Sequence, residues 1–303
     1  MAQTNGVLPW PVDWHGGASL HPYVVCDVFT SVPLEGNQLG VFVDGSPFTD
    51  DDMQRLAREM NFSETVFLRP STDGGDVALR IFTPRTELPF AGHPVMGTAF
   101  VVATALGADT VTLETLGGLV TITLERDGSH VVFGRMQQPI PSRRLFERPR
   151  ELLEALGVGR SDLPIEVYDA GVPHVFVTLS DEDSVAALTP DMDALAALGI
   201  AANCCAGQGR CWQTRVFYPA AGISEDAATG SAAGPLAIHL ARHDRIRFGE
   251  QIEIRQGAQI GRPSLLYATA TGDGDRIDSV EVGGAAVIVA EGRFRTALAK
   301  TNQ

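Results

Sequence analysis

The most constraining feature of this sequence is the segment from Pro94 to Leu106, which contains no charged residue. Proline suits the first helical position, so the segment predicts a helix that has no solvent face and is buried all round. The free N–H groups at its start, on Val95, Met96 and Gly97, need partners and favour an anion such as a carboxylate. Gly97 would let such a ligand approach the backbone. The alternative is a core helix capped by the protein itself.

The same stretch occurs twice. RIFTP at residues 80–84 matches RVFYP at residues 215–219, an offset of 135 positions. Adding this offset to 94–106 leads to 229–241, TGSAAGPLAIHLA, a second helix without acidic or strongly basic residues. Two copies are too few for a solenoid, so they indicate a duplicated domain. Each half is expected to wrap strands around one apolar helix.

The length of 303 residues fits two domains of ordinary size. The segment 139–149 has three prolines, several charges and no periodicity, so it is the expected boundary. We therefore expect an N-terminal extension at 1–20, a first domain at 21–138 and a second at 150–296. The basic cluster is interpreted as a solvated connector; it comprises Arg143, Arg144, Arg148 and Arg150.

Charge and composition exclude several classes of partner. A formal net charge of −14 argues against nucleic acid or anionic membrane, because both need a basic surface. No signal peptide or membrane-spanning run is visible. The four cysteines fit no zinc template and are expected to be reduced thiols. These features predict a cytoplasmic protein.

The familiar cofactor and nucleophile motifs are missing: there is no GxGxxG after a strand, no Walker loop and no GxSxG. No cofactor is therefore expected. His239 and His243 lie four residues apart near a helix end, which is typical of a metal pair or of a complement to the helix dipole. No third ligand is visible, so we expect no metal. His15, His21 and His130 are predicted to lie at the surface or in the tail.

Three residues remain as candidates for chemistry: Glu64, His93 and Asp226, each beside a turn or a helix start. Two carboxylates and an imidazole in one cleft between the halves can move protons at carbon without a cofactor, provided that burial raises the pKa of the base. Taken singly, each has an ordinary structural explanation: a surface carboxylate, a loop histidine bonded to backbone, and a helix cap.

Six motifs in order give the chain a resemblance to the PhzF family of phenazine-biosynthesis isomerases. They are DVFTSVPLEGN at 27–37, NFSETVF at 61–67, RIFTPRTELPFAGHPVMGTA at 80–99, GVPH at 171–174, GISEDAATGSA at 222–232 and GRPS at 261–264. The resemblance spans nearly the whole chain after the first twenty residues.

The resemblance implies an α+β fold of the diaminopimelate epimerase type, with two pseudo-symmetric domains, and a homodimer. It implies a cofactor-free isomerase that moves a proton from C3 to C1 of trans-2,3-dihydro-3-hydroxyanthranilate, a small cyclic carboxylate. By the same resemblance, Glu64 is the acid/base residue, and His93 and Asp226 lie near the substrate. The substrate carboxylate is expected on Gly92, Gly230 and Ser231.

Two positions depart from the family pattern: Gln38 and Ala227 stand where proline is usual, which changes loop stiffness and concerns substrate fit. Two alternatives stay open. An amino-acid epimerase or racemase of the same fold resembles this chain but uses cysteines at the paired helix starts, where this chain has Ala91 and Asp226. A binding protein could keep the fold without turnover.

Overall fold

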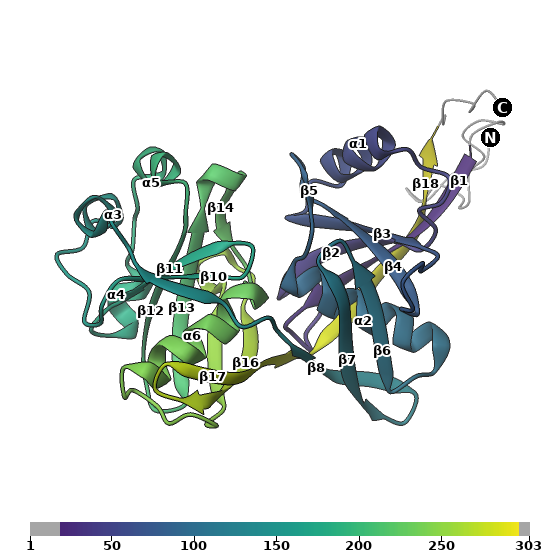
Figure 1. The fold of residues 1–303 in the computed structure, drawn as a ribbon. Helices are drawn as coiled ribbons and strands as arrows, with labels where there is room; N and C mark the ends of the chain where they lie inside the picture. Colours follow the sequence, from purple (N-terminus) through teal and green to yellow (C-terminus); the bar gives the residue numbers. More distant parts are fainter. Residues whose placement is uncertain (1–18, 297–303) are drawn as a thin grey trace, which may run out of the picture.

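The computed structural model describes residues 19–296, which form two lobes side by side (Figure 1). The helices are α1 (Asp50–Met60), α2 (Gly92–Leu106), α3 (Pro149–Leu156), α4 (Glu182–Ala186), α5 (Met192–Leu198) and α6 (Gly230–Arg242). The strands before the expected boundary are β1 (Ser19–Val28), β2 (Asn37–Phe42), β3 (Glu64–Arg69), β4 (Val77–Phe82), β5 (Glu87–Leu88), β6 (Thr110–Thr115), β7 (Gly118–Asp127) and β8 (His130–Gln137). The later strands are β9 (Ser142–Leu145), β10 (Glu166–Asp169), β11 (Pro173–Thr178), β12 (Ala201–Gln208), β13 (Cys211–Tyr218), β14 (Ile223–Asp226), β15 (Ile252–Gln256), β16 (Ser264–Asp273), β17 (Arg276–Gly284) and β18 (Ala286–Thr296).

Strand pairing follows the same scheme in both lobes. In the first, β2 runs parallel to β3 and β4 parallel to β6; in the second, β11 runs parallel to β12 and β13 parallel to β15. The repeated arginines also match. Arg80 forms an ion pair with Glu87 and lies 5.4 Å from the Phe82 ring, while Arg215 pairs with Glu225 and lies 5.0 Å from the ring of Phe217. The structure therefore confirms the internal repeat.

Each lobe gains an edge strand just after the chain crosses into it. After β8 the chain crosses over, and β9 pairs with β10; after β17 it crosses back, and β18 pairs with β1 (Figure 1). Between the crossings, β8 and β17 pair with each other and join the lobes. The domain boundaries expected from the sequence remain a proposal. Residues 286–296 belong to the second domain in that proposal, but they form β18, which pairs with β1 of the first lobe.

The expected solvated connector is partly wrong. Residues 142–145 form β9, and Arg143 forms an ion pair with Glu166, whose side chain is 2% exposed. The charge on this arginine is used to neutralise a buried carboxylate, a contact between distant residues that local composition does not reveal.

Helix α2 is the centre of the first lobe. Its residues from Gly92 to Ala103 are buried, but the last turn emerges, and Leu106 is 59% exposed. The helix begins two residues earlier than predicted, so Val95 N–H bonds to the carbonyl of Ala91 instead of a ligand. A Cβ on Gly97 would lie 2.6 Å from a methyl carbon of Val28. The expected ligand contact at Gly97 is therefore wrong: its absent side chain lets a core strand approach.

Further differences concern single residues. His21 is 6% exposed and its ring centroid lies 4.5 Å from that of Phe48, so the prediction of a surface histidine is wrong. The expected extension at 1–20 lies outside the described residues except for its last two, which open β1. Between residues 19 and 296, no helix combines the length and the apolar character that crossing a membrane requires.

Candidate active site

The N-termini of α2 and α6 meet between the lobes. A Cβ on Gly92 would lie 2.8 Å from the backbone nitrogen of Ser231, and one on Gly230 would lie 3.3 Å from the Gly92 carbonyl carbon. Beside this contact is a cavity of about 360 Å³. All six residues expected to act on or bind a substrate line this cavity: Glu64, Gly92, His93, Asp226, Gly230 and Ser231.

Glu64 begins β3, and its carboxylate lies beside the first turn of α2. Its Oε2 atom is 3.3 Å from His93 Nε2, and both residues are buried, at 7% and 4% exposed. Burial raises the pKa of Glu64 from 4.5 to about 8, and the charge of Asp226 adds to the shift. Burial lowers the pKa of His93 to about 3, against a hydrogen bond with the Gln38 backbone. The pair is a protonatable carboxyl beside a neutral imidazole.

Asp226 ends β14 and faces the same cavity. Its Oδ1 accepts from Asn37 Nδ2 at 2.8 Å and its Oδ2 accepts from Thr229 Oγ1 at 2.6 Å. Burial raises the pKa of Asp226 to about 6, and these two hydrogen bonds oppose the rise. Asn37 Nδ2 also lies 3.3 Å from His93 Nδ1, and Ser63 donates to Asn37 Oδ1. Asn37 therefore connects the candidate catalytic residues.

Sequence reasoning missed Asn37, Gln256 and His174. Asn37 is the last residue of the DVFTSVPLEGN motif, but its contacts with Asp226 and His93 are not visible in the sequence. Gln256 donates to the Asp226 carbonyl and to Thr229 Oγ1, each at 2.9 Å, and nothing in its sequence neighbourhood signals this. His174 ends the GVPH motif, whose presence could have marked it. All three act through contacts over long sequence distances.

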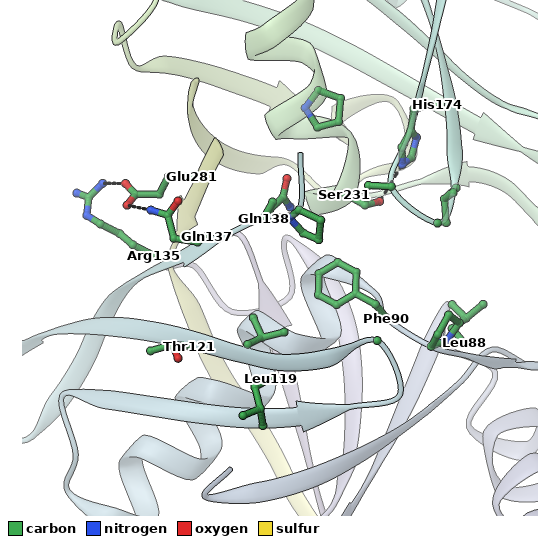
Figure 2. A pocket seen from close by; sticks show the side chains of 18 of the residues that line it. Leu88, Phe90, Leu119, Thr121, Arg135, Gln137, Gln138, His174, Ser231 and Glu281 are labelled. Carbon is green, nitrogen blue, oxygen red and sulfur yellow. Dashed lines mark hydrogen bonds and ion pairs between the residues drawn. The ribbon is translucent and has the colours of Figure 1, made fainter. Parts of the chain in front are cut away.

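A second, larger cavity of about 790 Å³ adjoins the first (Figure 2). Leu88 and Phe90 line both cavities, as do His174 and Ser231. The far end is polar, where Glu281 accepts from Arg135 and Gln137 (Figure 2). The candidate site therefore adjoins a broad, mainly apolar space between the lobes, which is a usual setting for a small organic ligand.

His239 in α6 and His243, the C-cap of that helix, have a third neighbour that the sequence did not reveal. Glu166 approaches His239 and His243, and the three potential ligand atoms lie within 4.8 Å of one another. Glu166 Oε2 also accepts from Tyr168, and its Oε1 pairs with Arg143. Although burial opposes it, these hydrogen bonds hold the pKa of Glu166 below its usual range. Because the carboxylate is already bonded by an arginine and three other donors, the cluster is explained as a buried hydrogen-bond network, and the absence of a metal stays a prediction.

The cysteines do not contribute to the cavity. Cys26, Cys204 and Cys205 are buried, and burial raises the pKa of each thiol. The position that precedes α2 is Ala91, its N-cap, and Asp226 holds the related position before α6. Among the described residues that line the cavity, none is a cysteine, so the arrangement gives no support to a two-cysteine racemase.

Comparisons with known proteins agree with this geometry. A solved hydroxyproline epimerase from Agrobacterium vitis matches 91% of this chain and 91% of its own at a TM-score of 0.65 and 12% identity. A solved PhzF-family phenazine biosynthesis protein from Bacillus anthracis matches 91% of this chain and 99% of its own at a TM-score of 0.80 and 24% identity. The trans-2,3-dihydro-3-hydroxyanthranilate isomerase of Pseudomonas aeruginosa is 54% identical over 90% of this chain and 99% of its own. The fold is thus that of the diaminopimelate epimerase-like isomerases.

The family model described as phenazine biosynthesis-like protein matches residues 26–292. The chain belongs to this family, the PhzF isomerases, as the sequence motifs predicted.

The raised pKa of Glu64 predicts a measurable pH dependence of stability. Because the folded-state pKa exceeds the unfolded value, the contribution of Glu64 is fully present below pH 4.5 and is lost as the pH rises through about 8. Thermal unfolding should therefore show the Tm of the wild type falling relative to the Tm of Glu64→Gln as the pH rises across this range. The variant carries every other titratable group, so a constant difference in Tm would contradict the raised pKa.

Proposed function

We propose that this protein is a trans-2,3-dihydro-3-hydroxyanthranilate isomerase that acts in phenazine biosynthesis. The observation that carries the proposal is the placement of Glu64, whose buried carboxyl lies 3.3 Å from His93 in a cavity at two facing helix starts. The name of the Pseudomonas aeruginosa relative, at 54% identity, supplies the substrate.

In this proposal the substrate carboxylate binds at the facing N-termini of α2 and α6, near Gly92, Gly230 and Ser231. The first N–H groups of a helix lack acceptors within the helix and attract anions. The ionised Glu64 takes the proton from C3 and returns it to C1, while the ring double bonds shift. His93 lies beside the Glu64 carboxyl, and the negative charge of Asp226 helps to keep the pKa of Glu64 high, so that Glu64 can hold the proton before returning it. No redox step is involved, so these side chains supply the acid/base chemistry that the reaction needs.

Turnover of substrate deuterated at C3 tests the proposal. Because C3–H cleavage is part of the reaction, we expect deuterium to leave C3 and a primary isotope effect to appear on kcat/KM. Mass spectrometry and NMR of the product show where the deuterium is, and the rates with labelled and unlabelled substrate give the isotope effect. Reactions without enzyme give the background. A product that keeps its deuterium at C3 would exclude the proposed proton shift.

We further propose a cytoplasmic homodimer that binds neither nucleic acid nor membrane. The net charge of −14 supports the absence of nucleic acid, and four free cysteines suit a reducing compartment. Leu116 and Leu119, 64% and 48% exposed, are apolar surface of the kind that subunit contacts cover. Light scattering on the purified protein should give twice the chain mass of 32.3 kDa, whereas a single-chain mass at micromolar concentration would reject the dimer.

A further inference from the structure

Behind Ser231 lies a row of polar side chains to which the proposed chemistry gives no role. His174, on β11, has its Nε2 atom 2.9 Å from Ser231 Oγ, and its Nδ1 atom 3.3 Å from Asn203 Nδ2, on β12. Figure 2 shows the histidine and the serine facing each other at the cavity wall. His174 and Asn203 are buried, at 3% and 1% exposed. A hydrogen bond between two buried groups has a defined direction, which here can be worked out.

Asn203 determines which groups donate and which accept in this row. Its Nδ2 atom donates to the carbonyl of Ala201 at 2.9 Å, and this contact fixes the amide, because the reverse orientation would place two oxygens together. The second hydrogen of Nδ2 then faces His174 Nδ1, so that nitrogen is the acceptor. Burial lowers the pKa of His174 to about 4, and the nearby Asp169 opposes the shift only in part, so the ring is neutral. A neutral ring with an accepting Nδ1 carries its hydrogen on Nε2.

The hydrogen on Nε2 decides what Ser231 does. His174 donates to Ser231 Oγ, so the serine accepts from the histidine and its own hydrogen stays free to point elsewhere. This is the reverse of a Ser-His-Asp triad, in which the histidine accepts the proton of the serine. Asn203 Oδ1 is buried and has no partner among the described residues. Such an unsatisfied atom is destabilising, so the contribution of Asn203 to stability does not by itself explain the amide at this position.

We propose that His174 is a positioning residue, held in its Nε2–H tautomer by Asn203, that makes Ser231 a hydrogen-bond donor to the carboxylate of the substrate. The ligand part of this inference rests on the proposed function. The tautomer part does not, because it follows from contacts within the protein. The arrangement also excludes Ser231 as an activated nucleophile.

The tautomer is measured without substrate. In protein labelled with ¹⁵N-histidine, NMR distinguishes a protonated from an unprotonated ring nitrogen, and comparison with His174→Gln assigns the signals. At neutral pH we expect a neutral His174 with hydrogen on Nε2 and none on Nδ1. The Nδ1–H tautomer, or a charged ring, would overturn the proposal.

Kinetics test whether His174 acts through Ser231. His174→Leu and Ser231→Ala should each raise KM about 10-fold or more, because a hydrogen bond to a charged group is lost or misdirected, while kcat changes little. His174→Leu in the Ser231→Ala background should add nothing further, since the partner is already gone. His174→Gln, whose amide N–H can replace Nε2–H, should restore most of the affinity. Additive effects, or no rescue by glutamine, would show a merely structural role.

Asn203→Asp supplies an opposite control. Neither oxygen of the introduced carboxylate can donate to Ala201, so the new side chain must turn away from that carbonyl and accept from His174 Nδ1; Nε2 then becomes an acceptor and takes the hydrogen of Ser231. We expect KM to rise to about the value of Ser231→Ala. The NMR spectrum should show the hydrogen of His174 on Nδ1 and none on Nε2. An unchanged KM in a variant with the switched tautomer would overturn the link to substrate binding. Failure of the wild type to turn over the proposed substrate, with the expected tautomer present, would count against the proposed function alone.

Discussion

Replacing Glu64 by glutamine is expected to lower kcat by about 10²–10⁴-fold, the usual contribution of a general acid or base. Glutamine keeps the size of the side chain, so the cavity and the contact with His93 should persist. The amide cannot take a proton from carbon, and no second carboxylate replaces it, because Asp226 is engaged by Asn37 and Thr229. Steady-state kinetics with trans-2,3-dihydro-3-hydroxyanthranilate measures the loss, and KM should change far less than kcat.

The matched control is Glu59→Gln, the same chemical change at an exposed position of α1. It should leave kcat and Tm within error of the wild type. Near-wild-type turnover in Glu64→Gln would remove Glu64 from the mechanism, whereas a similar loss in the control would point to impurity or misfolding instead of chemistry.

The second large effect is expected from Gly92→Ala. The added methyl carbon would lie 2.8 Å from Ser231 N and 2.9 Å from the Gly230 carbonyl carbon, which are backbone atoms that cannot rotate away. The two helix starts must therefore separate, and a displacement of about 1 Å at a reacting site can cost about 10²-fold in rate. We expect kcat/KM to fall by roughly that factor and the free energy of unfolding to fall by about 1–3 kcal/mol, the usual result of overpacking.

Gly159→Ala is the matched control, because a Cβ there has open space and no positive φ to strain it. Its kinetics should equal those of the wild type. If Gly92→Ala also kept full activity, the close contact between α2 and α6 could be opened without consequence, and the facing helix starts would not define the substrate position.

Much of the fold follows from local sequence. Strand β4 (Val77–Phe82) and helix α5 (Met192–Leu198) are examples, because periodicity and turn residues act over a few positions. The charge-free segment from Pro94 correctly predicted a helix at the centre of a lobe. The sequence did not predict that the last turn of this helix is exposed, or that Gly97 packs against Val28 instead of a ligand. Composition shows that a helix face is buried, but it does not show what lies against that face.

The residues of the candidate site also separate into those that the sequence predicted and those that it did not. The repeat and the motifs nominated Glu64, His93 and Asp226, and the structure brings them to one cavity. Asn37 and His174, which join or orient the candidate residues, depend on contacts between strands and helices far apart in the chain. A sequence pattern cannot specify such a partner, because each of many polar residues could form the bond.

The sequence by itself determined the duplicated α+β architecture, the family, and the three residue types that proton transfer needs. Tertiary structure alone decided the pairing of β9 with β10 and of β18 with β1, the burial that raises the pKa of Glu64, and the donors around Glu166. The physical reason is that propensity and periodicity are local. Burial and hydrogen-bond direction, by contrast, depend on which distant surfaces meet once both lobes have folded.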